Sequence, residues 1–567
     1  MSVFSRASVK RLLGDLPYTA EIYWHLRQRG RPLSKSFSLR RLEKALPGWL
    51  EQVQTARGAH APTGRRVLIF ATLRYWIEHA VLLGMSLAGQ GHEVTLVYLP
   101  YANYQKPFNR FDLRRQNLYA RRVLGGAAPA VRSLSLLDVP ALDETLPPEL
   151  DAAVRDVALR DAQYTLQVEE VAENDPLYRL RLERNRDAAR RGLAWLRSEL
   201  GSSGPASALA GEAKQLPPAA DHDRLVLLTP NGSILEMGVM YQAARLLGIP
   251  VVTYEFGEQR GRIWLAQQAE VMRQETDALW QARRDSPLNE EQWEQVRSLF
   301  ASRQNASLWE NFARTWQGQP SQGGERVRRA LGLDAGRPVV VLAANVIGDS
   351  LTLGRQVFTS SMTEWLKKTL RYFARRPDVQ LVVRIHPGER YITGPSVADL
   401  ARSVLAELPL GQHADHIHLV AALDPINTYD LLLIADLGLV YTTTVGMEMA
   451  MSGVAALVVG QTHYRGKGFT LDPDSWEAYD RLLDQALADP GRFKLTRAQV
   501  EQAWNYAYRF FFEYPCPFPW HLLDFWSQLE TWPLARVFST EGRQAFGATL
   551  DYLVGSPRRY EESEAEG

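Results

Sequence analysis

Short apolar runs of strand length alternate with helical stretches in two separate parts of the chain, and this alternation constrains the fold most. In the first part, RVLIFAT (66–72) precedes a helical pattern over 76–88, and a Gly-Gln-Gly turn then leads to VTLVYLP (94–100). This order is typical of a βαβ unit, in which two parallel strands need a crossover helix. The turn after 66–72 lacks a GxGxxG pattern. We therefore predict a parallel sheet without a dinucleotide fingerprint.

A second unit of the same kind begins at RLVLLTP (224–230). A helical pattern over 234–247 follows it, Gly248 suits the end of that helix, and IPVVTYEFG (249–257) is the next predicted strand. The intervening residues are mostly charged and helical in pattern up to residue 200, and 201–222 is a Gly-, Ser-, Ala- and Pro-rich stretch predicted to be a flexible loop. We assign both units to a first domain at 61–270.

The second part of the chain, from 336 to 490, repeats the alternation. Its predicted strands are PVVVLAANV (338–346), VQLVVRIHP (379–387), IHLV (417–420), LGLVYT (437–442) and VAALVVG (454–460), and its predicted helices cover 361–375, 396–407, 427–435 and 446–452. Strands alternating with helices over this length predict a doubly wound α/β domain. Helical patterns outside the two domains predict an N-terminal extension at 1–60, a connection at 271–335, and C-terminal helices with a disordered tail at 491–567.

Composition and charge exclude several classes of protein. The 65 Lys and Arg residues balance 64 Asp and Glu, whereas a nucleic-acid binder normally shows a basic excess. One cysteine, Cys516, excludes an internal disulfide and a zinc site of paired cysteines, which fits a reducing cytoplasm. His413, His416 and His418 have a spacing found in metal sites, but no acidic cluster or cysteine supports one, and we interpret them as loop residues.

We find no secretory signal and no apolar window near the length of about 20 residues that a spanning helix needs. We therefore expect a cytoplasmic protein. Residues 1–45 interleave Arg and Lys with Leu, Tyr and Trp. This pattern fits either a helix packed on the first domain or peripheral contact with the inner face of the membrane.

Four features of the second domain fall at predicted strand ends, where ligands bind in open parallel sheets. Arg384 and the pair His386-Pro387 close the strand 379–387, and the imidazole can donate a hydrogen bond to a phosphate oxygen. Thr442, Thr443 and Thr444 come after LGLV (437–440) and precede a helix, where hydroxyls and backbone N–H groups form an anion site.

The other two features complete a predicted nucleotide pocket. Glu448 lies one helical turn after the threonine run, where its carboxylate can accept hydrogen bonds from ribose hydroxyls. The loop 460–468 carries Tyr464, Arg465 and Lys467 between glycines, and its cations suit a diphosphate or phosphate ester. Each feature alone has a structural explanation, such as a turn, an N-cap or a surface carboxylate. Their common place at strand ends favours a phosphate-bearing ligand.

The segments RIHPGE, YDLLLIADLGLVYTTTVGMEMAMSG and HYRGKGFT together resemble the bacterial capsule polysaccharide biosynthesis proteins, over about 337–480. These are GT-B glycosyltransferases that include transferases of the acidic sugar Kdo. The His-Pro and Ser/Thr pieces are shared with bacterial sialyltransferases and teichoic-acid glycerophosphotransferases. The resemblance implies an α/β, GT-B-like fold, in which two Rossmann-like domains, one for acceptor and one for donor, face each other across a cleft. It also implies metal-independent, inverting transfer from a nucleotide sugar, with a CMP-linked donor favoured, to a saccharide or glycolipid acceptor.

In such families two acidic residues and a glycine close a strand of the first domain and supply the general base. The matching place here is YEFGE, where Phe256 replaces the second acid. Glu255 is the first choice for the base and Glu258 the second, because a carboxylate within reach can take the proton of an attacking hydroxyl. Either carboxylate can instead serve as a cap or pair with a nearby arginine.

Further strand ends are expected to face the same cleft. Asn345 and Asp349 follow VVVLAA (339–344), and Asn231-Gly232 follows the strand 224–230, where a plain turn is an equal alternative. Two other functions stay open at this point. One is transfer of a polyol phosphate from a CDP carrier, and the other is a non-catalytic nucleotide-sugar-binding component of a polysaccharide assembly complex.

Overall fold

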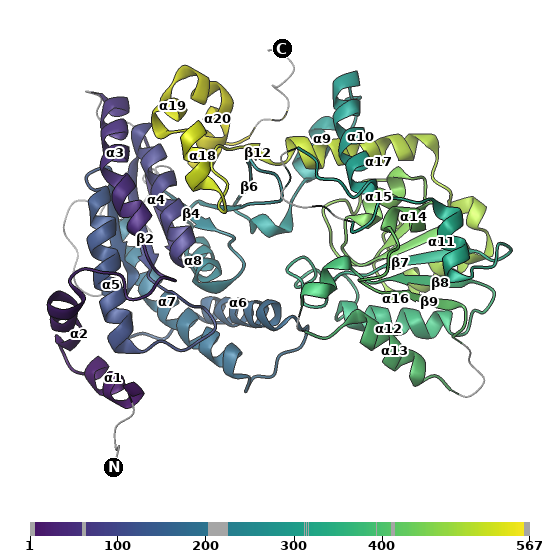
Figure 1. The fold of residues 1–567 in the computed structure, drawn as a ribbon, viewed down its shortest axis with the longest axis horizontal. Helices are drawn as coiled ribbons and strands as arrows, with labels where there is room; N and C mark the ends of the chain where they lie inside the picture. Colours follow the sequence, from purple (N-terminus) through teal and green to yellow (C-terminus); the bar gives the residue numbers. More distant parts are fainter. Residues whose placement is uncertain are drawn as a thin grey trace.

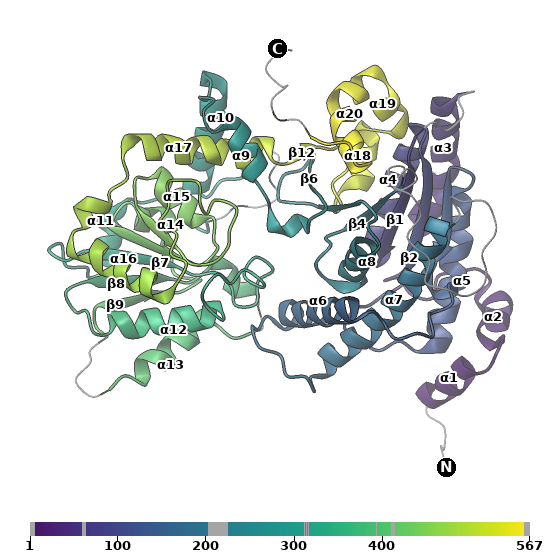
Figure 2. The same ribbon diagram turned by 180° about the vertical axis from the view of Figure 1, so that it is seen from behind.

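A computed structural model of the protein contains two separate β-sheets, each surrounded by helices, at opposite ends of an elongated molecule (Figure 1, and Figure 2 from behind). The structure describes residues 6–58, 64–201, 225–310, 312, 315, 317–392, 394–409, 414–558 and 560. Nearly all of the predicted loop 201–222 and of the predicted disordered tail lie outside these residues, as does His413. The predicted domain boundaries stay predictions.

The first sheet has five parallel strands and an antiparallel edge. Its order is β12-β6-β5-β4-β1-β2-β3. The parallel strands are β1 Arg66–Thr72, β2 Glu93–Leu99, β3 Val131–Ser135, β4 Leu225–Pro230 and β5 Val251–Glu255, and the edge consists of β6 Arg262–Gln267 and β12 Cys516–Pro517. The edge strand β3 lies inside a stretch that the sequence predicts to be mostly helical. Its five residues are only partly buried and carry a weak strand pattern, which explains the wrong prediction.

The second sheet is parallel throughout, in the order β11-β10-β7-β8-β9. Its strands are β7 Val339–Ala343, β8 Gln380–Arg384, β9 Ile417–Val420, β10 Leu437–Val440 and β11 Ala456–Val458. Counted within each half of the molecule, the parallel strands of both sheets have the same order, 3-2-1-4-5. The chain therefore reverses its direction of travel between β1 and β4 and again between β7 and β10. The predicted α/β class with two Rossmann-like sheets is confirmed.

Helices connect the strands where the sequence predicts them. Those within the two α/β units are α4 Arg74–Gly89, α8 Leu235–Leu246, α12 Met362–Phe373, α13 Val397–Ala406, α14 Thr428–Leu432, α15 Val445–Met451 and α16 Trp476–Ala488. The additional helices are α1 Arg6–Asp15, α2 Thr19–Tyr23, α3 Arg40–Arg57, α5 Arg110–Leu124, α6 Pro148–Leu166, α7 Pro176–Gly201, α9 Asp277–Arg283, α10 Glu290–Gln304 and α11 Gly324–Leu331. Within the described part of the chain, every helix is too short or too polar to span a bilayer.

The C-terminal segment joins the two halves. Helix α17 (Arg497–Tyr508) packs against α15, and a π-helical turn (Arg509–Glu513) continues it. The chain then returns to the first sheet, where β12 pairs with β6 and the helices α18 Phe525–Thr531, α19 Leu534–Phe538 and α20 Thr540–Leu553 lie beside α3 and α4 (Figure 1). Phe510 and Phe511, in the π-helical turn, are buried.

Candidate functional site

Two adjoining cavities lie between the sheets and form one continuous cleft. The first cavity has a volume of about 880 Å³ and the second of about 820 Å³. Both are lined by a common set of residues, which are Tyr164, Phe256, Gly257, Trp264, Met272, Ser350 and Arg355. Residues that follow strands of the first sheet line the first cavity, and residues that follow strands of the second sheet line the second cavity. The cleft therefore joins the carboxyl ends of both sheets.

The second cavity lies where the strand order of the second sheet reverses. Asn345 follows β7 and Thr442 follows β10, and the Thr442 backbone N–H donates to Asn345 Oδ1 at 3.2 Å. This hydrogen bond joins the two loops at the point where the crossover connections diverge. Ligands of doubly wound sheets bind at such a point, beyond the carboxyl ends of the strands. Asn345 is thus brought to the cavity as the sequence predicts.

The threonine run forms one wall of the second cavity. Thr442, Thr443 and Thr444 all line it, directly before α15. Thr442 is only 4% exposed, and its hydroxyl oxygen has no hydrogen-bond partner among the described residues. A buried hydroxyl without a partner costs free energy, so it marks a place where a ligand atom would be stabilising. Hydroxyls at the start of a helix suit an anionic ligand.

His386 and Pro387 stand on the opposite loop of this cavity. His386 caps the 3₁₀ turn Pro387–Tyr391, and its Nδ1 accepts from the Gly388 backbone N–H at 3.0 Å. Because Nδ1 is an acceptor, the proton of the neutral ring lies on Nε2. The Nδ1 contact therefore fixes the orientation of the ring and makes Nε2 its donor nitrogen. Glu258 and Asp349 also line this cavity.

Sequence reasoning missed His463 as a residue of the second cavity. His463 follows β11, lines the second cavity and is 6% exposed. Its ring stacks on that of Phe510, with 3.6 Å between the centroids, and its Nδ1 lies 3.0 Å from the Tyr506 hydroxyl oxygen. Nε2 has no partner among the described residues. Burial, with Arg355 and Lys467 nearby, holds the pKa of His463 well below its usual range, so the ring is neutral. The position of His463 just after a predicted strand of the second sheet could have identified it from the sequence.

Glu255 lines the first cavity, together with three other carboxylates, Asp156, Asp161 and Glu270. It is the last residue of β5, and its two oxygens accept from Asn231 Nδ2 at 2.9 Å and from the Phe256 backbone N–H at 3.0 Å. Burial raises its pKa, against the opposing effect of these two hydrogen bonds. A half-buried carboxylate with fixed geometry and a raised pKa suits proton transfer near neutral pH. Asn231 adopts a left-handed backbone (φ 59°), which aims its amide at Glu255.

Aromatic side chains form much of the remaining wall of the first cavity. Tyr75, Tyr104 and Tyr164 are 40%, 40% and 45% exposed, and Trp76 and Trp264 lie among them. Rings that stay open to solvent in a cleft offer flat apolar surface together with a polar edge. Such surfaces can pack on the faces of sugar rings while hydroxyl groups form hydrogen bonds.

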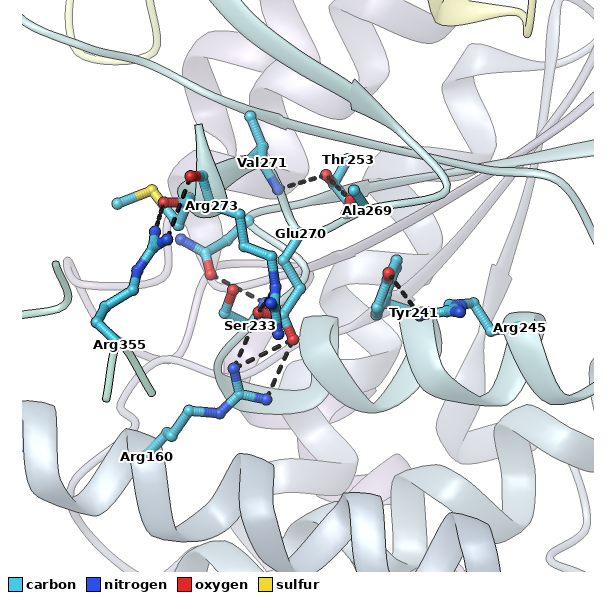
Figure 3. A network of polar contacts seen from close by, with 12 residues as sticks. Arg160, Ser233, Tyr241, Arg245, Thr253, Ala269, Glu270, Val271, Arg273 and Arg355 are labelled. Carbon is cyan, nitrogen blue, oxygen red and sulfur yellow. Dashed lines mark hydrogen bonds and ion pairs between the residues drawn. The ribbon is translucent and has the colours of Figure 1, made fainter. Parts of the chain in front are cut away.

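An arginine connects the two halves beside the cleft. Arg355, from the segment between β7 and α12, donates to the backbone carbonyls of Met272 and Arg273, next to the first sheet. The neighbouring Glu270 binds Arg160 of α6 through both carboxylate oxygens, at 2.9 and 3.1 Å. Figure 3 shows Arg160 and Arg355 reaching this segment from different sides. Burial lowers the pKa of Arg355 to about 10, so the side chain remains a cation facing both cavities.

The structure does not bring every predicted residue to the cleft. Glu448 is buried, and its Oε1 accepts from Arg303 Nη1 at 2.5 Å. Arg384 is buried and donates to the Ala421 carbonyl at 2.7 Å. Gly232 lies in a tight turn with φ 78°, where a Cβ atom would lie 2.6 Å from the Thr253 Cγ2 atom. These contacts are structural, and a ligand role for the three residues stays a prediction.

Three predicted ligand residues of the glycine-rich loop after β11 likewise turn away from the cleft. Tyr464 is fully buried and donates to the Thr443 carbonyl at 2.5 Å. Arg465 donates to backbone carbonyls that include that of Val458, and Lys467 pairs with Asp277. None of the three is among the residues that line either cavity. Across the residues that the structure describes, no group of three or more His, Cys, Asp or Glu side chains is placed to hold a metal ion.

Comparisons with known proteins give weak likenesses only. No family model matches the chain, and no curated protein matches it. A beta Kdo 2,4 transferase, KpsC of Thermosulfurimonas dismutans, is 17% identical over 49% of this chain and 78% of its own, with a TM-score of 0.30. A UDP-GlcNAc 2-epimerase of Neisseria meningitidis is 11% identical over 79% of this chain and 99% of its own, with a TM-score of 0.25. A glycosyltransferase of Rickettsia africae is 8% identical over 87% of this chain and 100% of its own, with a TM-score of 0.26.

Proposed function

We propose that the protein is a glycosyltransferase that moves a sugar from a nucleotide-activated donor to a saccharide or glycolipid acceptor of the cell envelope, with inversion at the anomeric carbon. The observation that carries this proposal is the shared cleft. Glu255, with its raised pKa, lines one cavity, and the threonine run with His386 lines the adjoining cavity at the reversal of strand order. A proton acceptor and an anion site therefore open into the same space.

The donor binds in the second cavity in this proposal. Its phosphate lies between Thr442–Thr444 and the ring of His386, whose Nε2–H donates to a phosphate oxygen. The sequence resemblance favours a CMP-linked sugar. Asn345 fixes the Thr442 backbone, so that the loop is ordered before the ligand arrives. Hydrogen-bond donors of the protein that are already in place stabilise developing charge without having to reorganise when the reaction occurs.

The acceptor lies in the first cavity and presents a hydroxyl group to Glu255. The hydroxyl oxygen forms a bond to the anomeric carbon as the bond from that carbon to the phosphate oxygen breaks. The Glu255 carboxylate takes the hydroxyl proton, and the nucleotide leaves with the electron pair. The threonine hydroxyls and His386 stabilise the charge that develops on the leaving phosphate. Direct displacement from the opposite face inverts the anomeric carbon.

A ligand screen followed by product analysis tests this proposal. The folded protein is heated with CMP, CDP, UDP and GDP compounds, because a ligand at a hundredfold excess over its Kd adds about 2.7 kcal/mol of stability. The stabilising nucleotide, as its sugar conjugate, is then incubated with saccharide and glycolipid acceptors, and the products are identified by mass spectrometry. A new glycoside is the expected result. A phosphodiester product, or donor binding without turnover of any acceptor, would contradict the proposal.

A further inference from the structure

The N-terminal helices expose an unusual amount of apolar surface. Of the eighteen large apolar side chains exposed in the described structure, seven lie between residues 9 and 26. The most exposed of these are Leu12 (60%), Tyr18 (72%), Ile22 (56%) and Leu26 (69%). Ile22 in α2 and Leu26 in the π-helical turn that continues it (Trp24–Gln28) are four residues apart and share one side, and Tyr18 is the N-cap residue just before α2. A concentration of this kind marks a contact surface rather than scattered exposure.

This surface is held firmly on the rest of the molecule. Arg114 of α5 donates to the carbonyls of Gly14 at 3.2 Å and Leu16 at 2.7 Å, and it pairs with Glu21. Arg110 pairs with Asp15 at 3.1 Å. Both acidic residues of the stretch are therefore engaged by arginines of α5. Figure 1 and Figure 2 show α1 and α2 on the outer side of α5, at the end of the molecule remote from the second sheet.

The outward charge of the same stretch is positive. Residues 9–31, which contain this stretch and the turn after it, hold five Lys and Arg residues against two acidic ones, a net charge of +3 in a chain whose total is +1. Arg11, Arg27, Arg29 and Arg31 are exposed, and none forms an ion pair with a carboxylate of the described residues. Apolar side chains and unneutralised cations thus share one end of the first half.

A basic hollow adjoins this apolar surface. It has a volume of about 560 Å³ and is lined by Trp24, His25, Arg29, Gly30, Leu118, Arg121 and Arg122. Arg121 and Arg122 pair with Asp138 and Glu43, so Arg29 supplies the charge that no carboxylate offsets. A guanidinium beside two further arginines suits a phosphate group.

We propose that the face formed by residues 9–31, with the hollow at Arg29, binds the surface of an anionic phospholipid bilayer. The apolar side chains enter the interface between headgroups and acyl chains, and the arginines contact lipid phosphates. A bilayer fits better than a protein partner, because it offers apolar and anionic contacts together over a surface as broad as this one. The proposal does not rest on the proposed function, since it concerns binding alone.

Vesicle flotation of the full-length protein tests the proposal. Vesicles of phosphatidylcholine alone are compared with vesicles that also contain phosphatidylglycerol, at low and high salt. Binding is expected to the anionic vesicles only and to weaken with salt, because exposed charges are screened. The double variant Arg27→Gln/Arg29→Gln should bind about 25-fold more weakly, which corresponds to about 1 kcal/mol for each cation near the surface.

The apolar contribution is tested by Leu12→Asp/Leu26→Asp, which should abolish flotation. Leu433→Asp is the matched control, because Leu433 is exposed to a similar extent (66%) but lies in the second half, just after α14, and it should float like the unchanged protein. Equal binding to neutral vesicles, absence of binding, or full binding by the Leu12/Leu26 variant overturns the proposal. A dimer in solution that the same variant dissociates, without flotation, would instead assign this face to a second copy of the chain.

Discussion

The two sheets share one strand order, yet their carboxyl ends carry different chemistry. Beyond the first sheet, Asn231 and Glu255 form a hydrogen-bonded pair that presents a carboxylate to the cleft. Beyond the second sheet, Asn345 instead binds the backbone of Thr442, and hydroxyl groups line the cavity. Topology therefore determines where a ligand can bind, and the residues that follow each strand determine which ligand it is.

Two carboxylates sharpen the contrast. Glu255 in the first half and Glu448 in the second are both predicted from sequence to act on substrate. The structure gives Glu255 two neutral donors and a place in the cleft, whereas Glu448 has Arg303 as its partner. Glu255 is therefore the better candidate for proton transfer, because its partners are neutral amide groups and burial raises its pKa.

The largest expected effect is that of Glu255→Gln. If this carboxylate is the base, its loss should reduce turnover about 10²- to 10⁴-fold while donor affinity is unchanged. Turnover is measured under donor saturation and donor affinity by calorimetry. Glu258→Gln is the matched control, because this residue lines the second cavity and was the alternative base. A large loss in Glu258→Gln with an active Glu255→Gln would reverse the assignment.

The raised pKa of Glu255 also predicts the acidic limb of the pH profile. Only the ionised carboxylate accepts a proton, so turnover should fall as pH decreases through the pKa of Glu255. Because burial raises this pKa, the fall should occur above the value near 4.5 that is usual for glutamate. The rate is measured across the acidic and neutral range, with folding checked by circular dichroism. A limb at or below the usual value would contradict this environment.

Glu448→Gln should affect stability more than chemistry. It removes one partner of a buried ion pair, in which the Arg303 and Glu448 side chains are 2% and 6% exposed. The expected loss is about 3–5 kcal/mol in the free energy of unfolding, measured by denaturant titration. Glu325→Gln, at an exposed acid in α11, should change stability by no more than about 0.5 kcal/mol. A stable Glu448→Gln protein with weakened donor binding would restore the ribose-binding role predicted from sequence.

The ion pair of Arg303 and Glu448 also shows why part of the site was not predictable. Arg303 lies in α10, 145 residues before Glu448, and no local sequence pattern indicates that the two side chains are in contact. The same holds for Lys467 and Asp277, which are 190 residues apart. Local spacing correctly places residues at strand ends, but it does not decide whether a long side chain turns toward the cleft or toward a distant partner.

The fold was easier to predict from the sequence than the site, because the strands and helices depend on local patterns. The ten parallel strands are short, and nine of them lie where apolar runs predict strands, since burial on both faces favours continuous apolar sequence. The exception, β3, is a partly polar edge strand. The pairing of β12 with β6 joins segments about 250 residues apart, so it was also beyond local reasoning.

His386→Ala tests the anion site of the second half, and its expected effect on donor affinity is of intermediate size. Loss of a charge-assisted hydrogen bond should cost about 1.5–3 kcal/mol, which is about 10- to 150-fold in the Kd of the nucleotide donor. His418→Ala is the control, because His418 lies in β9 of the same sheet and lines neither cavity. Unchanged donor affinity in His386→Ala, measured by calorimetry, would remove this residue from the donor site.

Thr442→Val is expected to have the smallest effect. The direction in which it changes the stability of the ligand-free protein is nevertheless informative. The Thr442 hydroxyl is buried and has no partner among the residues that the structure describes, so a methyl group in its place should leave the ligand-free protein equally stable or more stable by about 1 kcal/mol. Donor affinity should fall by about 0.5–1.5 kcal/mol, because the donor loses one hydrogen bond. Thr462→Val is the matched comparison, since its hydroxyl donates to the Thr442 carbonyl at 3.3 Å and its loss should destabilise the ligand-free protein. Thermal melts with and without donor separate these results. If Thr442→Val destabilises the ligand-free protein as Thr462→Val does, the hydroxyl serves the fold, and the second half loses the feature that most distinguishes its strand ends from those of the first.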